Sequence, residues 1–174
     1  MSIPLNFTIE SKIILVWINI DIIIEICNYL SDKNKIMFLS VNKILDSNKN
    51  NIFYNDRTRY YNIKNLWYHD QFTDICVLDL CKLHILPKHV KKLQIYYLHY
   101  GAHIPNSITH LIFESYFNQY INGIIPKNVT YLSLGSYYKK DIKDAIPITV
   151  KKLVISKNYP YKSSIPKTCE VDFY

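Results

Sequence analysis

The stretch Ile104-Pro105-Asn106-Ser107-Ile108-Thr109-His110-Leu111-Ile112-Phe113 is the clearest copy of a motif that the chain repeats. The motif is Ile-Pro, then a β-branched residue, then Leu, any residue and a second hydrophobic residue. Related copies occupy residues 86–95, 125–134 and 146–155, and a shorter copy starts at Ile165. The copies begin 18, 21, 21 and 19 residues apart. A period of about 20 residues indicates supersecondary units stacked in a solenoid.

Each copy ends in the two-residue alternation of a β-strand, which puts both of its apolar side chains on the same face. One copy is too small to bury these groups, so stacked copies should bury them in shared columns. Proline suits the turn before the strand because it fixes φ and lacks an N–H donor. The columns expected inside are Leu93/Leu111/Leu132/Leu153, Ile95/Phe113/Leu134/Ile155 and Val90/Ile108/Val129/Val150. We also expect a degenerate copy from about Phe72, with a strand at 77–80.

The same alternation places the intervening strand residues on an open face of the solenoid, through which repeat proteins usually bind. This face is mixed, basic and aromatic, which suits a protein ligand; the other interpretation is a merely solvated face. The residues predicted to bind a protein substrate are Lys92, Gln94, Tyr96, His110, Ile112, Glu114, Tyr131, Ser133, Lys152 and Val154.

The net charge of +7 lies entirely in residues 51–174, which hold 16 Lys or Arg against nine acidic residues. This positive charge fits an acidic or nucleic-acid partner. A simpler explanation is that the lysines keep a solenoid soluble and prevent its edge strands from pairing with other molecules. The cysteines Cys27, Cys76, Cys81 and Cys169 show no zinc-site spacing, which indicates reduced thiols and no metal or cofactor. Asp21 and Glu25 interrupt the apolar stretch 13–27, so we expect no membrane span and a cytoplasmic protein.

A connecting segment lies between the expected N-terminal helices and the repeats. From Arg57 to His69 it mixes basic and aromatic residues. It could clamp single-stranded nucleic acid by stacking. We favour a helix whose aromatic residues belong to the core. No residues in the chain form a recognisable catalytic motif, and we expect no enzyme activity.

Residues 16–45 read as a helical hairpin. Ile22, Ile23, Ile26, Cys27 and Leu30 have the spacing of one buried helix face, and Asn19 or Asp21 could cap the helix. A break is expected at 31–34 and a second helix from Lys35 to Leu45.

This hairpin resembles an F-box, whose pattern is Leu-Pro-x-Glu-Leu-Leu-x-x-Ile-Leu-x-Tyr-Leu followed by Leu-x-x-Val-x-Lys-x-Trp. The residues that match it are Asp21, Ile22, Ile23, Ile26, Tyr29, Leu30, Leu39, Val41 and Lys43. Ile18-Asn19 stands where that family has Leu-Pro, and Leu45 stands where it often has Trp. The resemblance implies that the hairpin binds a Skp1-like subunit of a cullin ubiquitin ligase. The implied contact residues are Ile18, Asn19, Ile22, Ile23, Ile26, Leu30, Leu39, Val41 and Leu45.

The repeats resemble the FNIP family, whose signature appears as Phe117-Asn118-Gln119-x-Ile121 followed by Ile125-Pro126. The next copies weaken it to Tyr138-Lys139-Lys140-Asp141-Ile142 and to Tyr159-Pro160. An F-box followed by FNIP repeats is a combination of amoebae and of their giant viruses, which would place the protein in the host cytoplasm.

We therefore predict an α+β protein: an F-box-like hairpin at 12–46, a connector at 47–71, and FNIP repeats at 72–174. The repeats should form a parallel β-solenoid of five to six short strands that resembles leucine-rich repeats. The predicted function is a substrate-recognition adaptor of a Skp1–cullin–F-box ubiquitin ligase, with an unidentified protein substrate. The alternatives are a repeat-only interaction module capped by the helices and, less favoured, a nucleic-acid binder.

Overall fold

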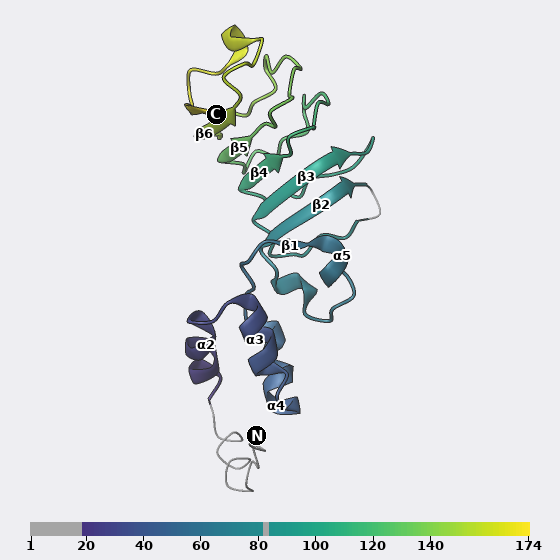
Figure 1. Ribbon diagram of the computed structural model, residues 1–174, viewed down its shortest axis with the longest axis vertical. Coiled ribbons are helices and arrows are strands. Elements are labelled where there is room, and N and C mark those ends of the chain that lie inside the picture. Colours follow the sequence, from purple (N-terminus) through teal and green to yellow (C-terminus); the bar gives the residue numbers. More distant parts are fainter. Residues whose placement is uncertain (1–18, 82–83) are drawn as a thin grey trace, which may run out of the picture. The chain divides into compact units, whose positions relative to one another are not determined.

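The computed structural model describes residues 19–81 and 84–174 of the chain. The chain divides into two compact units, with the boundary between Phe53 and Tyr54 (Figure 1). In the described residues, no helix is both long enough and apolar enough to cross a membrane.

The N-terminal unit consists of short helices. Helix α2 spans Ile20–Asn28, α3 spans Asp32–Leu39, α4 spans Lys43–Asp46, and the 3-10 helix η1 follows at Ser47–Asn51. The side chain of Asn19 accepts a hydrogen bond from the Asp21 N–H at the start of α2, as predicted. The segment 12–18 of the predicted F-box lies outside the described residues.

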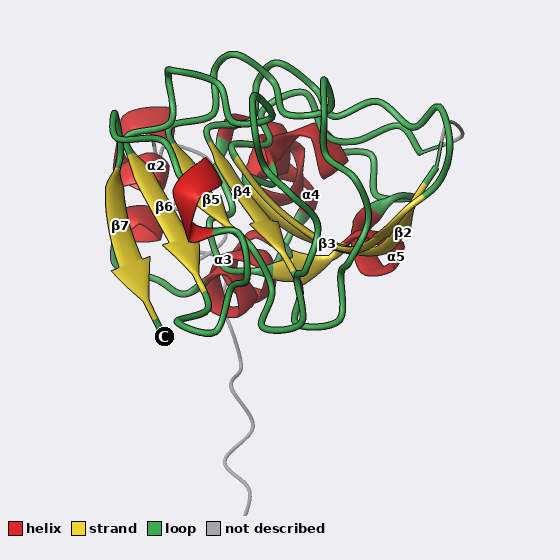
Figure 2. Ribbon diagram, turned by 90° about the horizontal axis from the view of Figure 1, so that it is seen from above, coloured by secondary structure: helices red, strands yellow, loops and turns green. Residues whose placement is uncertain are grey.

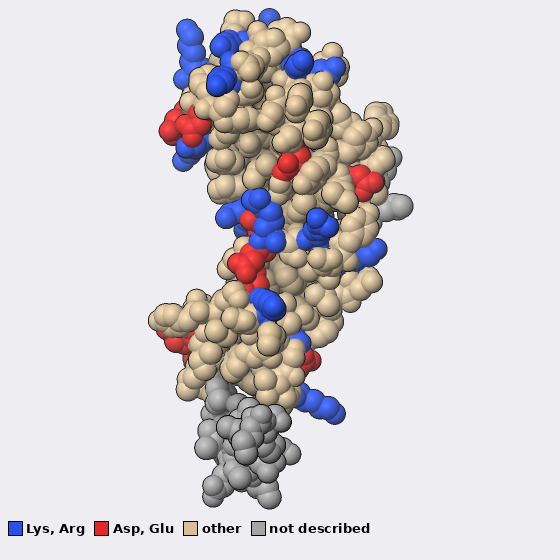
Figure 3. All heavy atoms as spheres, in the orientation of Figure 1, with Lys and Arg blue, Asp and Glu red and all other residues tan. Residues whose placement is uncertain are grey.

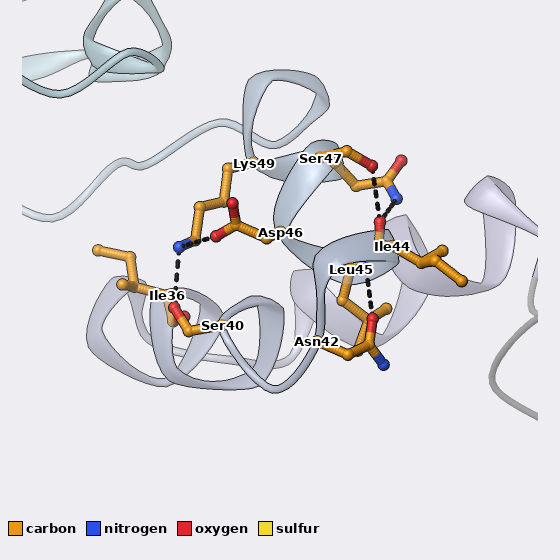
Figure 4. Close-up of polar contacts among 9 residues, drawn as sticks. Ile36, Ser40, Asn42, Ile44, Leu45, Asp46, Ser47 and Lys49 are labelled. Atoms are coloured by element: carbon orange, nitrogen blue, oxygen red, sulfur yellow. Dashed lines mark hydrogen bonds and ion pairs between the residues drawn. The ribbon is translucent and has the colours of Figure 1, made fainter. Parts of the chain in front are cut away.

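The single helix predicted from Lys35 to Leu45 is wrong. Helix α3 begins earlier, at Asp32, because the Ser31 hydroxyl caps it by accepting from the Asn34 N–H. It ends at Leu39, and a new helix begins after Asn42, whose Oδ1 accepts from the Leu45 N–H at 2.9 Å (Figure 4). Both caps are short polar side chains that satisfy free N–H groups at helix starts. The predicted break at 31–34 lies slightly earlier, at 29–31 between α2 and α3, and a second break at 40–42 was not predicted.

Ion pairs brace this small unit. The Lys49 ammonium donates to the Ser40 hydroxyl at 2.8 Å and pairs with Asp46 (Figure 4). Lys35 is 7% exposed, and it bonds Asp32 at 2.9 Å and the Phe53 carbonyl at 3.0 Å. Buried cations of this kind need such partners, because an unpaired one is costly. The apolar core around them is Ile23, Cys27, Leu39, Leu45 and Ile52.

The C-terminal unit is a parallel β-solenoid. In its described residues the strands form one seven-stranded sheet in chain order, with all neighbours parallel. Figure 2 shows the strands side by side, joined by long loops. The strands are β1 (Thr58–Arg59), β2 (Asp74–Leu80), β3 (Lys92–Leu98), β4 (His110–Phe113), β5 (Tyr131–Ser133), β6 (Lys152–Ile155) and β7 (Glu170–Phe173).

The three predicted core columns are confirmed, since none of their side chains is more than 1% exposed. The strand register aligns them, with Leu93, Leu111, Leu132 and Leu153 paired one after another. The turn before each strand is also repeated. The carbonyl of Lys91, for example, accepts from the N–H groups of both Thr109 and His110. The Ile-Pro motif thus sets the position at which each strand joins the sheet.

A further column of buried aromatic residues lies behind the strands. Phe117, Tyr138 and Tyr159 stack, with ring centroids 6.4 and 6.3 Å apart, and each is at most 2% exposed. These are the signature positions of three successive repeats, and the sequence did not reveal that they are buried.

The solenoid begins before the Ile-Pro motif does. Strand β1 pairs with β2, and an isolated bridge joins Tyr54 to Phe72, so the sheet has more strands than the five to six expected. The long helix favoured for 57–69 is wrong, because only Tyr60–Ile63 (α5) is α-helical, with the 3-10 turn η2 at His69–Gln71. Thr58–Arg59 pairs with β2 as strand β1, and turns occupy most of 64–68.

Candidate functional site

The open face of the sheet brings the predicted substrate-binding residues into columns. Lys92, His110, Tyr131 and Lys152 are paired in register across β3 to β6. Gln94, Ile112, Ser133 and Val154 form the adjacent column in the same way. Tyr96 follows Gln94 within β3, and Glu114 comes directly after β4. The sequence therefore placed these ten residues on one surface.

This surface differs in accessibility along its length. Lys92 and Tyr96 are exposed, whereas Gln94 is 9% exposed. The remaining predicted residues are partly exposed: His110, Ile112, Glu114, Tyr131, Ser133, Lys152 and Val154. A partner could therefore contact the open face over four strands without unfolding any of them.

Ion pairs occupy both ends of the open face. Near its start, Arg57 Nε lies 3.4 Å from Asp74 Oδ1. At its end, Lys152 Nζ lies 2.6 Å from Asp172 Oδ2 and 4.0 Å from Glu170 Oε1. The hydrogen bond to Asp172 raises the pKa of Lys152. Figure 3 shows basic side chains gathered beside acidic ones over the first strands of the solenoid.

The middle of the open face is aromatic. The rings of His110 and Tyr131 stack with centroids 5.4 Å apart, and His110 Nδ1 lies 3.0 Å from the Thr109 hydroxyl. Burial and the neighbouring Lys92 ammonium lower the pKa of His110. The imidazole is therefore neutral at pH 7 and adds no charge to this surface. The negative charge of Glu114 raises the pKa of Tyr96.

Four residues at the start of the open face escaped the sequence analysis: Arg57, Arg59, Asp74 and Cys76. Arg57 directly precedes β1, and the other three belong to β1 and β2, before the first Ile-Pro copy. The register aligns Arg59 with Cys76 and Cys76 with Gln94. Extending the alternation backwards from the predicted strand at 77–80 would have found Asp74 and Cys76. No comparable signal marks Arg57 or Arg59.

The N-terminal unit exposes a second set of side chains, which are apolar. Ile22 is 52% exposed and Ile26 38% exposed, so the prediction that they belong to a buried helix face is wrong. Only Ile23 and Cys27 of that set are buried. Other exposed apolar residues lie on α3, on α4 or beside them: Tyr29, Met37, Val41 and Ile44.

The predicted Skp1-binding residues thus fall into two groups. Asn19, Ile22, Ile26, Leu30 and Val41 are exposed or partly exposed, so a partner can reach them. Ile23, Leu39 and Leu45 are at most 2% exposed and form the core beneath. Ile18 lies outside the described residues.

Residues 19–81 and 84–174 contain no group of three or more His, Cys, Asp or Glu residues suited to a metal ion. The cysteines are free thiols. Cys81 Sγ and His84 Nδ1 lie 3.7 Å apart as an isolated pair. Burial raises the pKa of the Cys76 thiol, which keeps it protonated on the open face.

Comparison with protein families identifies the repeats. The family model named FNIP Repeat matches two overlapping segments, 102–137 and 120–158. Residues 102–158 are FNIP repeats. The predicted FNIP assignment is thereby confirmed for these turns of the solenoid, including the signature that contains Phe117.

Comparison with solved structures finds similarity to the protein described as "The crystal structure of CroV588 a novel circular LRR protein structure". The TM-score is 0.36 and the sequence identity 15%, over 60% of this chain. The match spans 24% of the length of that protein. No curated protein matches the sequence.

The FNIP repeats and the parallel β-solenoid that they form support a repeat module for protein–protein interaction in the C-terminal unit. Repeat solenoids of this type bind partners through an extended surface and are typically non-catalytic.

Proposed function

We propose that this chain is a non-catalytic adaptor that joins a protein substrate to a Skp1–cullin type ubiquitin ligase. The N-terminal unit would bind the Skp1-like subunit, and the open face of the FNIP solenoid would hold the substrate. The observation that carries the proposal is the set of apolar side chains that the N-terminal helices leave exposed.

The exposed apolar side chains of the small N-terminal unit indicate a binding partner. Ile22, Met37 and Val41 are each more than half exposed, although Ile23 and Leu39 beside them in sequence are buried. Large exposed apolar patches on a folded unit commonly mark an interaction site. Burying one such side chain in an interface would contribute roughly 1.5–3 kcal/mol.

The F-box-like pattern indicates a Skp1-like protein as the partner. Ile22, Ile26, Leu30 and Val41 occupy positions that resemble those with which F-boxes contact Skp1, and all four are at least partly exposed. The two-helix break at 40–42 separates Leu39 from Leu45, and both still pack inward. The core of the unit is thus formed by one subset of the pattern and its exposed surface by another.

The test is binding of the intact chain to a purified Skp1-like protein, measured by calorimetry beside an established F-box protein. Ile22→Ser should weaken binding by about tenfold or more, because the lost burial removes at least 1.4 kcal/mol. Ile148→Ser removes an equally apolar side chain, 81% exposed, from the solenoid and should have no effect.

Absence of binding by the intact chain, while the established F-box protein binds, would refute the adaptor role and leave the repeat interaction module. Equal losses from Ile22→Ser and Ile148→Ser would refute the contact surface. Circular dichroism of both variants checks that the helices remain folded.

A further inference from the structure

A cleft of about 600 Å³ lies between the loops that follow β3 and β4. It is lined by residues 97–102, residues 118–120, Ile124 and Lys140. The side chain of Gln119 joins the two loops, because it bonds both the N–H and the carbonyl of Leu98 at 2.9 Å. None of the predicted substrate-binding residues of the open face lines this cleft. It is therefore a separate feature of the solenoid.

The apolar side chains of the cleft differ in exposure. Leu98 is 6% exposed, and Ala102 and Ile124 are partly exposed, so these three form its base. Tyr97 and Tyr120 are 50% and 65% exposed, so their rings stand at its mouth. Exposed tyrosines are enriched in protein interfaces, because each offers a large contact area at a low cost in conformational entropy.

One cation at the cleft lacks an acidic partner. Lys140 Nζ lies over the Tyr120 ring, 5.0 Å from its centroid. No Asp or Glu residue lines the cleft, and Lys140 forms no ion pair within the described part of the chain. His99, the other basic lining residue, lies 3.5 Å from Asp79 Oδ2. Asp141, next in sequence to Lys140, accepts a hydrogen bond from a backbone N–H instead. The charge at the cleft thus favours a carboxylate beside Lys140.

The exposure of the cleft favours a protein segment over a small molecule. Pockets for small ligands commonly bury about 70–90% of the ligand surface. A cleft whose two tyrosine rings are half exposed or more does not enclose a ligand to that extent. The loops after β4 and β5 also carry Tyr116 and Tyr137, which stack with ring centroids 5.0 Å apart and are 80% and 54% exposed. A segment that continues along the surface has more aromatic area to contact.

We propose that this cleft is a docking site for an extended segment of a partner protein that presents an aromatic side chain and a carboxylate on the same face. The aromatic ring would pack on Leu98 and against the rings of Tyr97 and Tyr120, and the carboxylate would pair with Lys140. Aromatic pairs gain stability beyond the burial of their area. Residues i and i+2 of an extended segment share a face, so the preferred motif has one residue between the aromatic residue and the acid.

The experiment titrates the isotope-labelled full chain with the peptide acetyl-Gly-Glu-Ser-Phe-Ser-Glu-Gly-amide and follows backbone resonances by NMR. A Glu two residues before Phe and another two residues after it serve either chain direction. We expect shifts concentrated on residues 97–102 and 118–124 and on Lys140. The matched peptide with Ala for Phe should bind about tenfold more weakly, because burial of the ring is lost. The peptide with Gln at both Glu positions should bind about threefold more weakly, because an exposed ion pair is lost.

A second tyrosine–lysine pair supplies matched control variants. Lys64 Nζ lies over the Tyr61 ring, 4.9 Å from its centroid, and both residues lie outside the cleft. Lys140→Gln should abolish the preference for the Glu peptide over the Gln peptide, whereas Lys64→Gln should preserve it. Tyr120→Ser should weaken binding of the Glu peptide by about fivefold, and Tyr61→Ser should leave it unchanged. Unshifted resonances of the core strands show that each variant is folded.

Absence of binding, equal affinities of the three peptides, or equal losses from Tyr120→Ser and Tyr61→Ser would overturn the docking site. Binding of phenylacetate as tight as that of the Glu peptide would replace the segment with a small aromatic acid. Tighter binding of oligothymidylate at the same residues would replace it with nucleic-acid recognition. The experiment involves neither a Skp1-like protein nor the open face, so its outcome and that of the adaptor test are independent.

Discussion

Tyr138 and Tyr159 stack in the aromatic column with ring centroids 6.3 Å apart, yet only the Tyr159 hydroxyl is hydrogen-bonded. That hydroxyl accepts from the Ile142 N–H at 3.1 Å and donates to the Lys140 carbonyl at 2.9 Å. The Tyr138 hydroxyl is buried and has no partner among the described residues. The Tyr159 hydroxyl thus satisfies two backbone groups, whereas the Tyr138 hydroxyl is itself an unsatisfied polar group in the core.

Removal of each hydroxyl tests this difference. Tyr159→Phe should lower the free energy of unfolding by about 1–3 kcal/mol, because it leaves a buried N–H and a partly buried carbonyl unpaired. Tyr138→Phe should change it by less than about 0.5 kcal/mol or raise it, since no hydrogen bond is lost. Urea unfolding of the two variants measures both values. Equal losses would contradict the hydrogen-bond assignment.

High pH should unfold the solenoid through the same two residues. Burial raises the pKa of Tyr159 to about 12 and also raises that of Tyr138. Since the unfolded phenols titrate near pH 10, their contribution to stability is complete below about pH 10. This contribution is lost as the pH rises through the higher pKa values that the two phenols have in the folded protein.

The measurement is the free energy of unfolding at pH 9 and at pH 11 for the wild type and for Tyr138→Phe. Lysines titrate in both proteins, so the difference between them isolates the phenol. The variant should lose less stability between the two pH values. An identical loss would show that the Tyr138 phenol ionises as readily in the folded protein as in the unfolded chain.

The solenoid was predictable because each Ile-Pro copy determines its own register. A period of about 20 residues and a two-residue alternation suffice to place Leu111 and Phe113 inside and His110 and Ile112 on the open face. The first turn was missed because Tyr54 to Arg59 contains no such motif. It joins the sheet only through pairing with β2 and Phe72, which are distant in sequence.

The N-terminal unit was harder to predict, since its helices are short and their ends depend on single caps. Helix α3 ends at Leu39 and Asn42 caps the start of α4 three residues later, a break that helix periodicity does not determine. An Ile-rich helix also offers more than one apolar face, so spacing alone could not distinguish Ile22 from Ile23.

Gln119 provides another test of the return segments of the solenoid. Its side-chain amide donates to the Leu98 carbonyl and accepts from the Leu98 N–H, both at 2.9 Å. One side chain thus satisfies the backbone at the end of β3, where β4 is too short to pair. Gln119→Ala should lower the free energy of unfolding by about 1–3 kcal/mol.

Asn122→Ala is the matched control, because its side chain is exposed three residues away. Its effect should stay below about 0.5 kcal/mol, as for most surface substitutions. Hydrogen exchange of the Leu98 amide gives a second readout, which should accelerate in the Gln119 variant alone. Unchanged exchange would mean that another group protects this amide.

Gly135 is the position at which the solenoid tolerates no side chain. A Cβ there would lie 1.9 Å from the carbonyl oxygen of Glu114 and 2.6 Å from its carbon, both backbone atoms of the neighbouring turn. Gly135→Ala must therefore push the turns after β4 and β5 apart. We expect it to lower the free energy of unfolding by about 3 kcal/mol or more, at the upper end for overpacked sites.

Gly123→Ala is the comparison that separates crowding from backbone strain. Gly123 has φ +69° with no heavy atom within 4 Å of a built Cβ, so alanine there meets open space in a left-handed conformation. That strain costs about 1–2 kcal/mol. Thermal and urea unfolding should rank Gly135→Ala well below Gly123→Ala in stability. The reverse order would mean that the turns separate at Gly135 with little loss of strand pairing, and that the close approach is not required for stacking.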